Sequence, residues 1–147
     1  MSAEFESNIK MVKAELADWK GRVLEAIGDF AEGEAKLRAP VGKYLTGQVG
    51  GNLRTSIGHH VVKSEDAVQI GTNADYAIYV EKGTAPHLIL PKRAKVLSWL
   101  SAAGRMFARS VHHPGTRAQP FLTPAVEDNI NKIRDIVERV PTRLRED

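Results

Sequence analysis

The sequence predicts an α+β domain, and three observations support this prediction. Apolar residues recur at spacings of three and four over residues 1–38, as they do on one face of a helix. Short β-branched segments bounded by turn residues follow from residue 56 onward, which is typical of antiparallel strands. A second helical pattern closes the chain. We therefore expect a long N-terminal helix, a small antiparallel β-sheet with a β-hairpin, a short middle helix and a C-terminal helix packed on the sheet.

The first helix is long and carries a continuous apolar stripe. Its members are Phe5, Ile9, Val12, Leu16, Trp19, Val23, Ala26, Ile27 and Phe30. From Glu4 to about Lys36 the helix would measure roughly 48 Å at 1.5 Å per residue. A helix of this length cannot bury its whole stripe on a sheet built from the rest of the chain. We therefore expect part of it to pack on another subunit; the alternative is a helix with a frayed end.

The middle of the chain predicts two paired strands, a short helix and a further strand. Residues 56–63 and 66–72 are predicted to pair as antiparallel strands, and YAIYVEK at 76–82 to form a short helix. A short strand, HLILP, follows over 87–91.

The last third of the chain predicts a hairpin and a helix. Residues 94–102 and 105–113 flank an Ala-Gly turn and are expected to pair with each other. The final helix is expected to begin with Thr123 as its N-cap and Pro124 as its first helical residue, and to end near Pro141.

Length and composition indicate one domain of 147 residues. We expect residues 1–38 to form the long helix, 39–125 the sheet-containing core, 123–140 the C-terminal helix and 141–147 a tail. No apolar run approaches the roughly 20 residues that a membrane span needs, and the N-terminus lacks the apolar segment of a secretory signal. The chain has no cysteine, which excludes disulfides, thiolate zinc sites and cysteine nucleophiles.

Charge is distributed unevenly within a net charge of +3. Residues 82–126 contain no acid and seven bases, namely Lys82, Lys92, Arg93, Lys95, Arg105, Arg109 and Arg117. This block predicts a basic surface whose partner is an acidic protein or nucleic acid. Trp99, Phe107 and Phe121 are interleaved with it, and we interpret them as core residues rather than as a platform for stacking bases.

Patterns for catalysis, metals and cofactors are absent or incomplete. The adjacent pairs His59–His60 and His112–His113 lie in predicted strands, where neighbouring side chains point to opposite faces and cannot chelate one ion. No GxSxG motif frames a serine, and GKYLTGQ departs from a phosphate loop at Gln48. We therefore expect no enzyme, no metal site and no cofactor; a hydrolase using His112 or His113 is the least favoured alternative.

Glu81 lies in the most apolar local stretch of the middle region. We interpret it as a partly buried acid paired with a base such as Arg54 or His113. The alternative is a solvated carboxylate.

Three groups of residues together resemble the signatures of one protein family. The first comprises Ala39-Pro40-Val41, Thr46-Gly47, Asn52-Leu53-Arg54 and Ser56-Ile57. The second comprises Ile70-Gly71-Thr72-Asn73, Tyr76-Ala77, Tyr79-Val80-Glu81 and Gly83-Thr84, and the third His113-Pro114-Gly115-Thr116, Gln119-Pro120-Phe121-Leu122 and Pro124-Ala125. Over about residues 39–125 the chain resembles the head–tail joining, or tail-completion, proteins of long-tailed double-stranded DNA phages and prophages.

The resemblance implies a structural virion protein of the phage neck or tail top, made in the host bacterial cytoplasm. Such proteins join head to tail, by tail completion or head closure, as a ring, commonly a hexamer, around the DNA channel. The implied partners are further copies of the chain and adjacent neck and tail proteins. Genome DNA would pass through the channel without sequence-specific binding, and no membrane partner is implied. The basic block would dock on an acidic neighbouring ring or face the DNA, and we prefer the ring. The alternative function is a small basic DNA-binding module.

The resemblance also implies structural roles for particular residues. These are Thr46, Gly47, Asn52, Leu53, Ser56, Gly71, Tyr76, Ala77, Glu81, Gly83, Thr84, His113, Pro114, Gly115, Pro120 and Phe121. His113-Pro114-Gly115-Thr116 would form a turn that ends the last strand, and Pro120-Phe121 would seat the final helix.

Overall fold

The structure is a computed structural model that describes residues 2–42 and 50–142, with side chains from Ile9 onward. Thr46 and Gly47 of the first signature lie outside the described residues, as does the side chain of Phe5.

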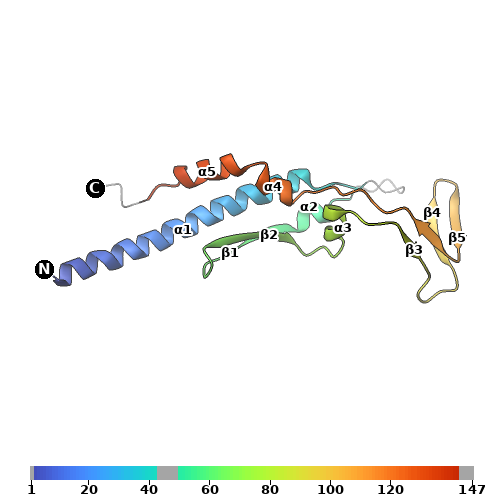
Figure 1. Cartoon of the computed structure of the whole chain (residues 1–147), viewed down its shortest axis with the longest axis horizontal. Helices are drawn as coiled ribbons and strands as arrows, with labels where there is room; N and C mark the ends of the chain where they lie inside the picture. The colour runs from blue at the N-terminus through green and yellow to red at the C-terminus, as the bar shows by residue number, and fades with distance from the viewer. Residues whose placement is uncertain (1, 43–49, 143–147) are drawn as a thin grey trace.

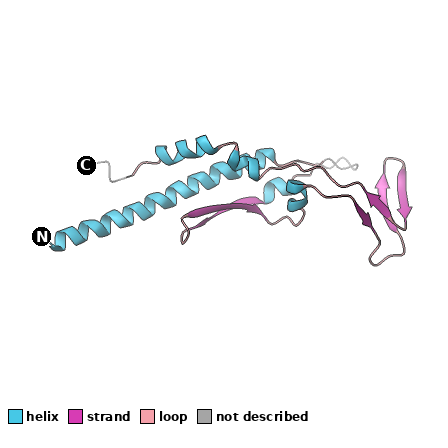
Figure 2. Ribbon diagram, viewed as in Figure 1, coloured by secondary structure: helices cyan, strands magenta, loops and turns pink. Residues whose placement is uncertain are grey.

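The described residues form an α+β fold, as predicted (Figure 2). The helices are α1 (Ser2–Arg38), α2 (Asn52–Ser56), α3 (Ala77–Lys82), α4 (Thr123–Glu127) and α5 (Ile130–Arg139). The strands are β1 (Ile57–Val62), β2 (Ala67–Thr72), β3 (His87–Ile89), β4 (Leu97–Ser101), β5 (Gly104–Ala108) and β6 (Val111–His113). The long first helix, the antiparallel pair, the short middle helix and the hairpin are confirmed.

The strands form three separate two-stranded antiparallel sheets, β1–β2, β3–β6 and β4–β5, where we had expected one small sheet. In the first sheet Ile57 pairs with Thr72, and Val62 pairs with Ala67. The segment 105–113, expected to be one strand, is divided between β5 and β6. It divides because β5 turns back on β4, whereas β6 pairs with β3, which lies far upstream in the chain.

The C-terminal helix differs from the prediction in two ways. It is broken at residues 128–129 into α4 and α5, and both pieces pack on α1 rather than on a sheet. The two-stranded sheets offer little apolar surface, whereas α1 offers a long stripe. Trp19 Nε1 donates a hydrogen bond of 2.9 Å to the carbonyl oxygen of Val140, and the Lys132 ammonium lies 6.0 Å from the centre of the Phe30 ring.

The start of α4 also differs from the prediction. Thr123 is the first residue of the helix rather than its N-cap, and no side chain of the preceding residue, Leu122, caps it. Pro124 does lie in the first turn, as expected. Farther along, the buried side chain of Asn129 donates to the Ala125 carbonyl oxygen at 3.1 Å and so closes the break between α4 and α5.

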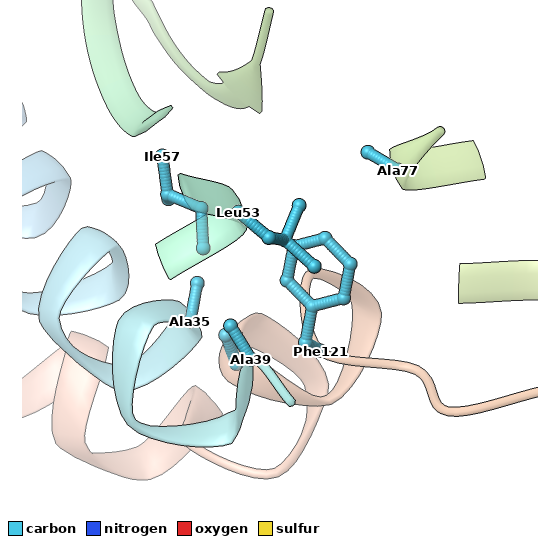
Figure 3. Packing of buried hydrophobic residues seen from close by; sticks show 7 residues of the cluster. Ala35, Ala39, Leu53, Ile57, Ala77 and Phe121 are labelled. Atoms are coloured by element: carbon cyan, nitrogen blue, oxygen red, sulfur yellow. The ribbon is translucent and has the colours of Figure 1, made fainter. Parts of the chain in front are cut away.

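The hydrophobic core is small and lies where the C-terminal end of α1 meets α2 and α4. Phe121 is its only fully buried large side chain among the described residues (Figure 3). Around it pack Ala35, Ala39, Leu53, Ile57, Ala77 and Ala125. Because four of these six neighbours are alanines, the elements approach closely, but the core contains little apolar volume.

The molecule is elongated, with its extremities far from this core (Figure 1). The N-terminal part of α1 projects at one end, and β3 to β6 form an arm, residues 87–113, at the other. The accessible surface is 11473 Å², whereas a compact monomer of 16.2 kDa would expose about 7,500 Å². The isolated chain therefore exposes roughly 4,000 Å² more than a compact monomer of its mass.

Candidate assembly surfaces

The arm is attached to the body at a junction made by residues 81–84 and 113–123, which belong to two of the signature groups. Glu81, on α3, accepts three main-chain hydrogen bonds at the start of α4. Its Oε2 accepts from the amides of Phe121 at 2.7 Å and Leu122 at 3.0 Å, and its Oε1 from that of Thr123 at 3.0 Å. A carboxylate at a helix N-terminus satisfies amides that have no partner within the helix. Glu81 thus holds α4 and the buried Phe121 ring in place.

Two opposing effects act on the Glu81 carboxyl. Partial burial raises its pKa. The hydrogen bonds from Phe121, Thr123 and Leu122 together lower the pKa by more than burial raises it, so the pKa lies below the ordinary value of 4.5. The carboxyl is therefore ionised at neutral pH. Our expectation of a partly buried and paired acid holds in part: the partners are backbone amides, and no ion pair with Arg54 or His113 occurs among the described residues. Arg54 instead donates to the Ala39 carbonyl oxygen at 3.2 Å.

A short two-stranded bridge between Thr84 and Thr116 completes the junction. Their main chains exchange two hydrogen bonds of 3.0 and 3.1 Å, and their hydroxyl oxygens lie 2.8 Å apart. Gly83 and Gly115 flank the bridge with φ of 72° and 87°. A Cβ atom on either glycine would collide with the backbone of the opposite segment, so both positions require glycine for conformation and for close approach.

The other signature residues lie around the core, and Asn52, Leu53 and Tyr76 also line a recess of about 270 Å³. Leu53 and Ala77 are buried, Asn52 begins α2 and lies exposed, and Gly71 pairs with Gly58 in the β1–β2 sheet. The Ser56 hydroxyl lies 2.6 Å from that of Thr72 and so ties α2 to the end of β2. Pro114 and Pro120 are exposed in the junction segment of residues 113–123.

The histidines take architectural positions in the described residues. The rings of His87 and His113 stack with their centroids 5.0 Å apart, and His113 Nδ1 accepts from the Gly115 amide at 3.1 Å. His112 is exposed on the same strand. No group of three or more His, Asp or Glu side chains in residues 9–42 and 50–142 is arranged to hold a metal ion.

His59 makes contacts that the sequence did not reveal. Its Nδ1 lies 2.6 Å from Glu32 Oε2 and its Nε2 lies 3.2 Å from Glu25 Oε2, so the ring links β1 to α1. The hydrogen bond with Glu32 raises the pKa of His59 above 6.5, against the opposing effect of burial. The ring lies directly over Gly28, where any Cβ atom would overlap it. The only signal of this contact in the sequence was Gly28, a glycine inside an otherwise helical pattern.

The seven basic residues of the block are all exposed, and none forms an ion pair in the described part of the chain. Five of them lie on the arm: Lys92, Arg93 and Lys95 in the loop between β3 and β4, Arg105 on β5, and Arg109 between β5 and β6. The arm carries no acid. Its surface is therefore strongly positive and free to bind a partner.

The β4–β5 hairpin exposes large apolar side chains on both faces. In its register Trp99 lies opposite Met106 on one face, and Phe107 and Leu100 lie on the other. Their exposed fractions are 41%, 44%, 62% and 58% in that order. Our interpretation of Trp99 and Phe107 as core residues is therefore wrong for the single chain, and only Phe121 is buried. A hairpin at the end of an arm has no second layer to cover it.

A second apolar surface lies on the N-terminal half of α1. Ile9, Val12 and Leu16 are exposed by 39%, 44% and 43%, because α5 reaches α1 only as far as Trp19. The stripe continues into a recess of about 810 Å³ between α1 and the β1–β2 hairpin. Leu16, Leu24 and Val61 contribute apolar surface to this recess.

In a comparison with models of protein families, residues 3–83 match the model of a known family. The family is HK97-gp10-like, described as "Bacteriophage HK97-gp10, putative tail-component". The match covers more than half of the chain, from α1 to the end of α3, and the arm lies beyond it. Comparisons with curated proteins and with solved structures found no match. No helix in the described residues is long and apolar enough to span a bilayer.

Proposed function

Because the chain belongs to the HK97-gp10-like family of bacteriophage tail components, we propose that it is a non-enzymatic joining protein of the phage neck or tail top. In this proposal several copies, commonly six, form a closed ring around the channel through which the genome passes. The ring completes the tail or closes the head, and so allows the two to join.

The observation that carries the proposal is the excess of exposed surface. The chain exposes 11473 Å² against about 7,500 Å² for a compact monomer, and large apolar side chains are exposed on α1, α3 and the arm. Exposed apolar patches of this extent mark association surfaces. The exposed apolar side chains of α1 and those of the arm are different surfaces at opposite ends of the molecule, which suits the head-to-tail contacts of a ring.

The basic loop of Lys92, Arg93 and Lys95 is proposed to dock on an acidic surface of an adjacent neck or tail ring. Contact with DNA fits less well, because seven bases on each of six copies would place about 42 positive charges around the channel. Such a lumen would bind phosphates strongly and retard the genome.

Deletion of the gene from its phage tests the proposed role. Electron micrographs of the lysate should show filled heads lying beside separate tails, and wild-type protein supplied from a plasmid should restore joined particles. The triple variant Lys92→Glu, Arg93→Glu, Lys95→Glu should fold normally and fail to restore them. The double variant Arg134→Glu, Arg139→Glu, on the exposed side of α5, is the control and should restore joining. Intact infectious particles from the deletion would refute the proposal.

The unpaired bases of the arm favour one alternative, a small basic DNA-binding module without enzymatic activity. Such a module would bind duplex DNA with an affinity that falls steeply with salt, because each phosphate contact releases counterions. Strong binding of this kind by the purified chain, together with normal particles from the deletion, would favour the module over the joining protein.

A further inference from the structure

We propose that neighbouring copies of the chain associate through two specific surfaces: the β4–β5 hairpin of one copy packs against the N-terminal half of α1 in the next. This inference rests on the proposed ring and names the contact that would build it. The hairpin surface comprises Trp99, Leu100, Met106 and Phe107, and the receiving surface comprises Ile9, Val12 and Leu16 with the adjoining recess.

The hairpin requires cover on both faces. An isolated two-stranded hairpin is marginal in water, and this one presents Trp99 and Met106 on one face and Phe107 and Leu100 on the other. A flat partner would cover only one of these faces. The recess between α1 and the β1–β2 hairpin has two walls, and its volume of about 810 Å³ is sufficient for several large side chains.

Charge selects this pairing over the contact of one arm with another. The arm carries five bases and no acid, so two arms in contact would bring ten positive charges together. Residues 2–29 of α1 carry six acids and four bases, a net charge of −2. The recess itself is lined by four acids and four bases, so its net charge is zero and it does not repel the basic arm. Two of its acids, Glu25 and Asp29, already lie 3.2 and 3.9 Å from His59 Nε2 and keep 63% and 79% of their side chains exposed.

The geometry and the area are also suitable for a ring. The two surfaces lie at opposite ends of the molecule, so each copy can give its hairpin to one neighbour and receive a hairpin from the other (Figure 1). A stable interface buries about 1,600 Å² in total, or about 800 Å² from each partner. The two contacts made by each copy would then bury about 1,600 Å² of its surface, well within the excess of roughly 4,000 Å².

The absence of cysteine makes a direct test simple, because each single variant then carries only the thiol that was introduced. Phe107→Cys and Leu16→Cys both replace exposed side chains. Mixed and treated with a short bismaleimide, the two single variants should give cross-linked dimers and nothing larger. The double variant should give a ladder that stops at the copy number of the ring. Leu37→Cys, at an exposed position near the other end of α1, replaces Leu16→Cys in the control pair and should give no cross-link to Phe107→Cys.

Two outcomes would overturn the inference. The first is a chain that stays monomeric and uncross-linked at 200 µM, and the second is a cross-link to Leu37→Cys with none to Leu16→Cys. In the second case oligomers exist but are joined by other surfaces, so the proposed ring would survive. The deletion phenotype decides the joining role separately. As a further check, Phe107→Glu should weaken self-association at least tenfold while leaving the thermal midpoint of the single chain unchanged.

Discussion

Replacing Glu81 tests whether the junction organises the fold. Its carboxylate is half-buried and accepts three amide hydrogen bonds, of 2.7, 3.0 and 3.0 Å, from consecutive residues. Glu81→Ala would leave these amides without their acceptor at the entry to α4. Because the first of them belongs to Phe121, the perturbation reaches the centre of the core directly.

The magnitude follows from the number and type of these bonds. A hydrogen bond to a charged group contributes about 1.5–3 kcal/mol, and loss of a helix cap costs about 0.5–2 kcal/mol. The three bonds share two oxygens, and solvent reaches part of the carboxylate, so they are not additive. We expect Glu81→Ala to lower the free energy of unfolding by about 2–4 kcal/mol and the thermal midpoint by roughly 6–15 °C. Glu81→Gln keeps one acceptor oxygen and should cost about half as much.

Acid should remove the difference between wild type and the glutamine variant. The pKa of Glu81 is lowered below 4.5 in the folded chain, so its stabilising contribution is fully present above pH 4.5. It is lost as the pH falls from that value through the lower folded pKa. The assay is thermal unfolding followed by circular dichroism at pH 7 and at steps below pH 4.5.

The control is Glu127→Gln, which changes an exposed carboxylate on α4 itself and should leave the midpoint within about 1–2 °C of wild type. Equal midpoints for Glu81→Ala and wild type at pH 7 would refute the argument. So would a difference that grows as the pH falls.

Three further predictions concern α1 and the core. The pKa of His59 is raised above 6.5, so His59→Gln should destabilise the chain most below pH 6.5. The difference in stability from wild type should shrink as the pH rises through the folded pKa of His59. A difference that grows with pH would contradict the pairing of His59 with Glu32. Gly28→Ala should destabilise the chain by about 1–3 kcal/mol because the new Cβ overlaps the His59 ring. Gly21→Ala has open space around it and should stabilise the chain by up to about 1 kcal/mol. Equal urea midpoints for the two variants would refute this distinction. Phe121→Ala should cost about 3–5 kcal/mol by chemical denaturation, and a loss under 1 kcal/mol would show that the core does not depend on that ring.

Local patterns predicted the elements well. The spacing of Val12, Leu16, Trp19 and Val23 predicted α1, and the β-branched run before the turn at residues 63–66 predicted the β1–β2 pair. Both are formed by residues close together in the sequence, so periodicity and turn residues are sufficient to predict them.

Long-range pairing could not be predicted in the same way. Nothing in HLILP or in SVHH specifies that His87 pairs with His113, and that pairing forms one of the three separate sheets that replace the single sheet we expected. The partners of Glu81 are backbone amides, which have no signature in the residue types. They reach the carboxylate only because two positive-φ glycines, Gly83 and Gly115, let the junction segments approach closely.

The arm shows where rules for monomers give a wrong result. Trp99 and Phe107 were assigned to the core because large apolar residues are usually buried, yet the chain leaves them exposed. An assembling subunit places such residues on surfaces that become interior only when copies associate. From the sequence, only the surplus of apolar residues on α1 predicted such an association; the residues of the hairpin did not.

Gold labelling of a tagged copy of the chain on intact particles tests most directly whether the protein joins head to tail. If the protein joins head to tail, gold should lie at one place on each particle, the point where the tail meets the head, and on no head or tail from which the neck is missing. Gold along the tail, at its distal tip, or on no part of the particle would show that the protein does not join head to tail.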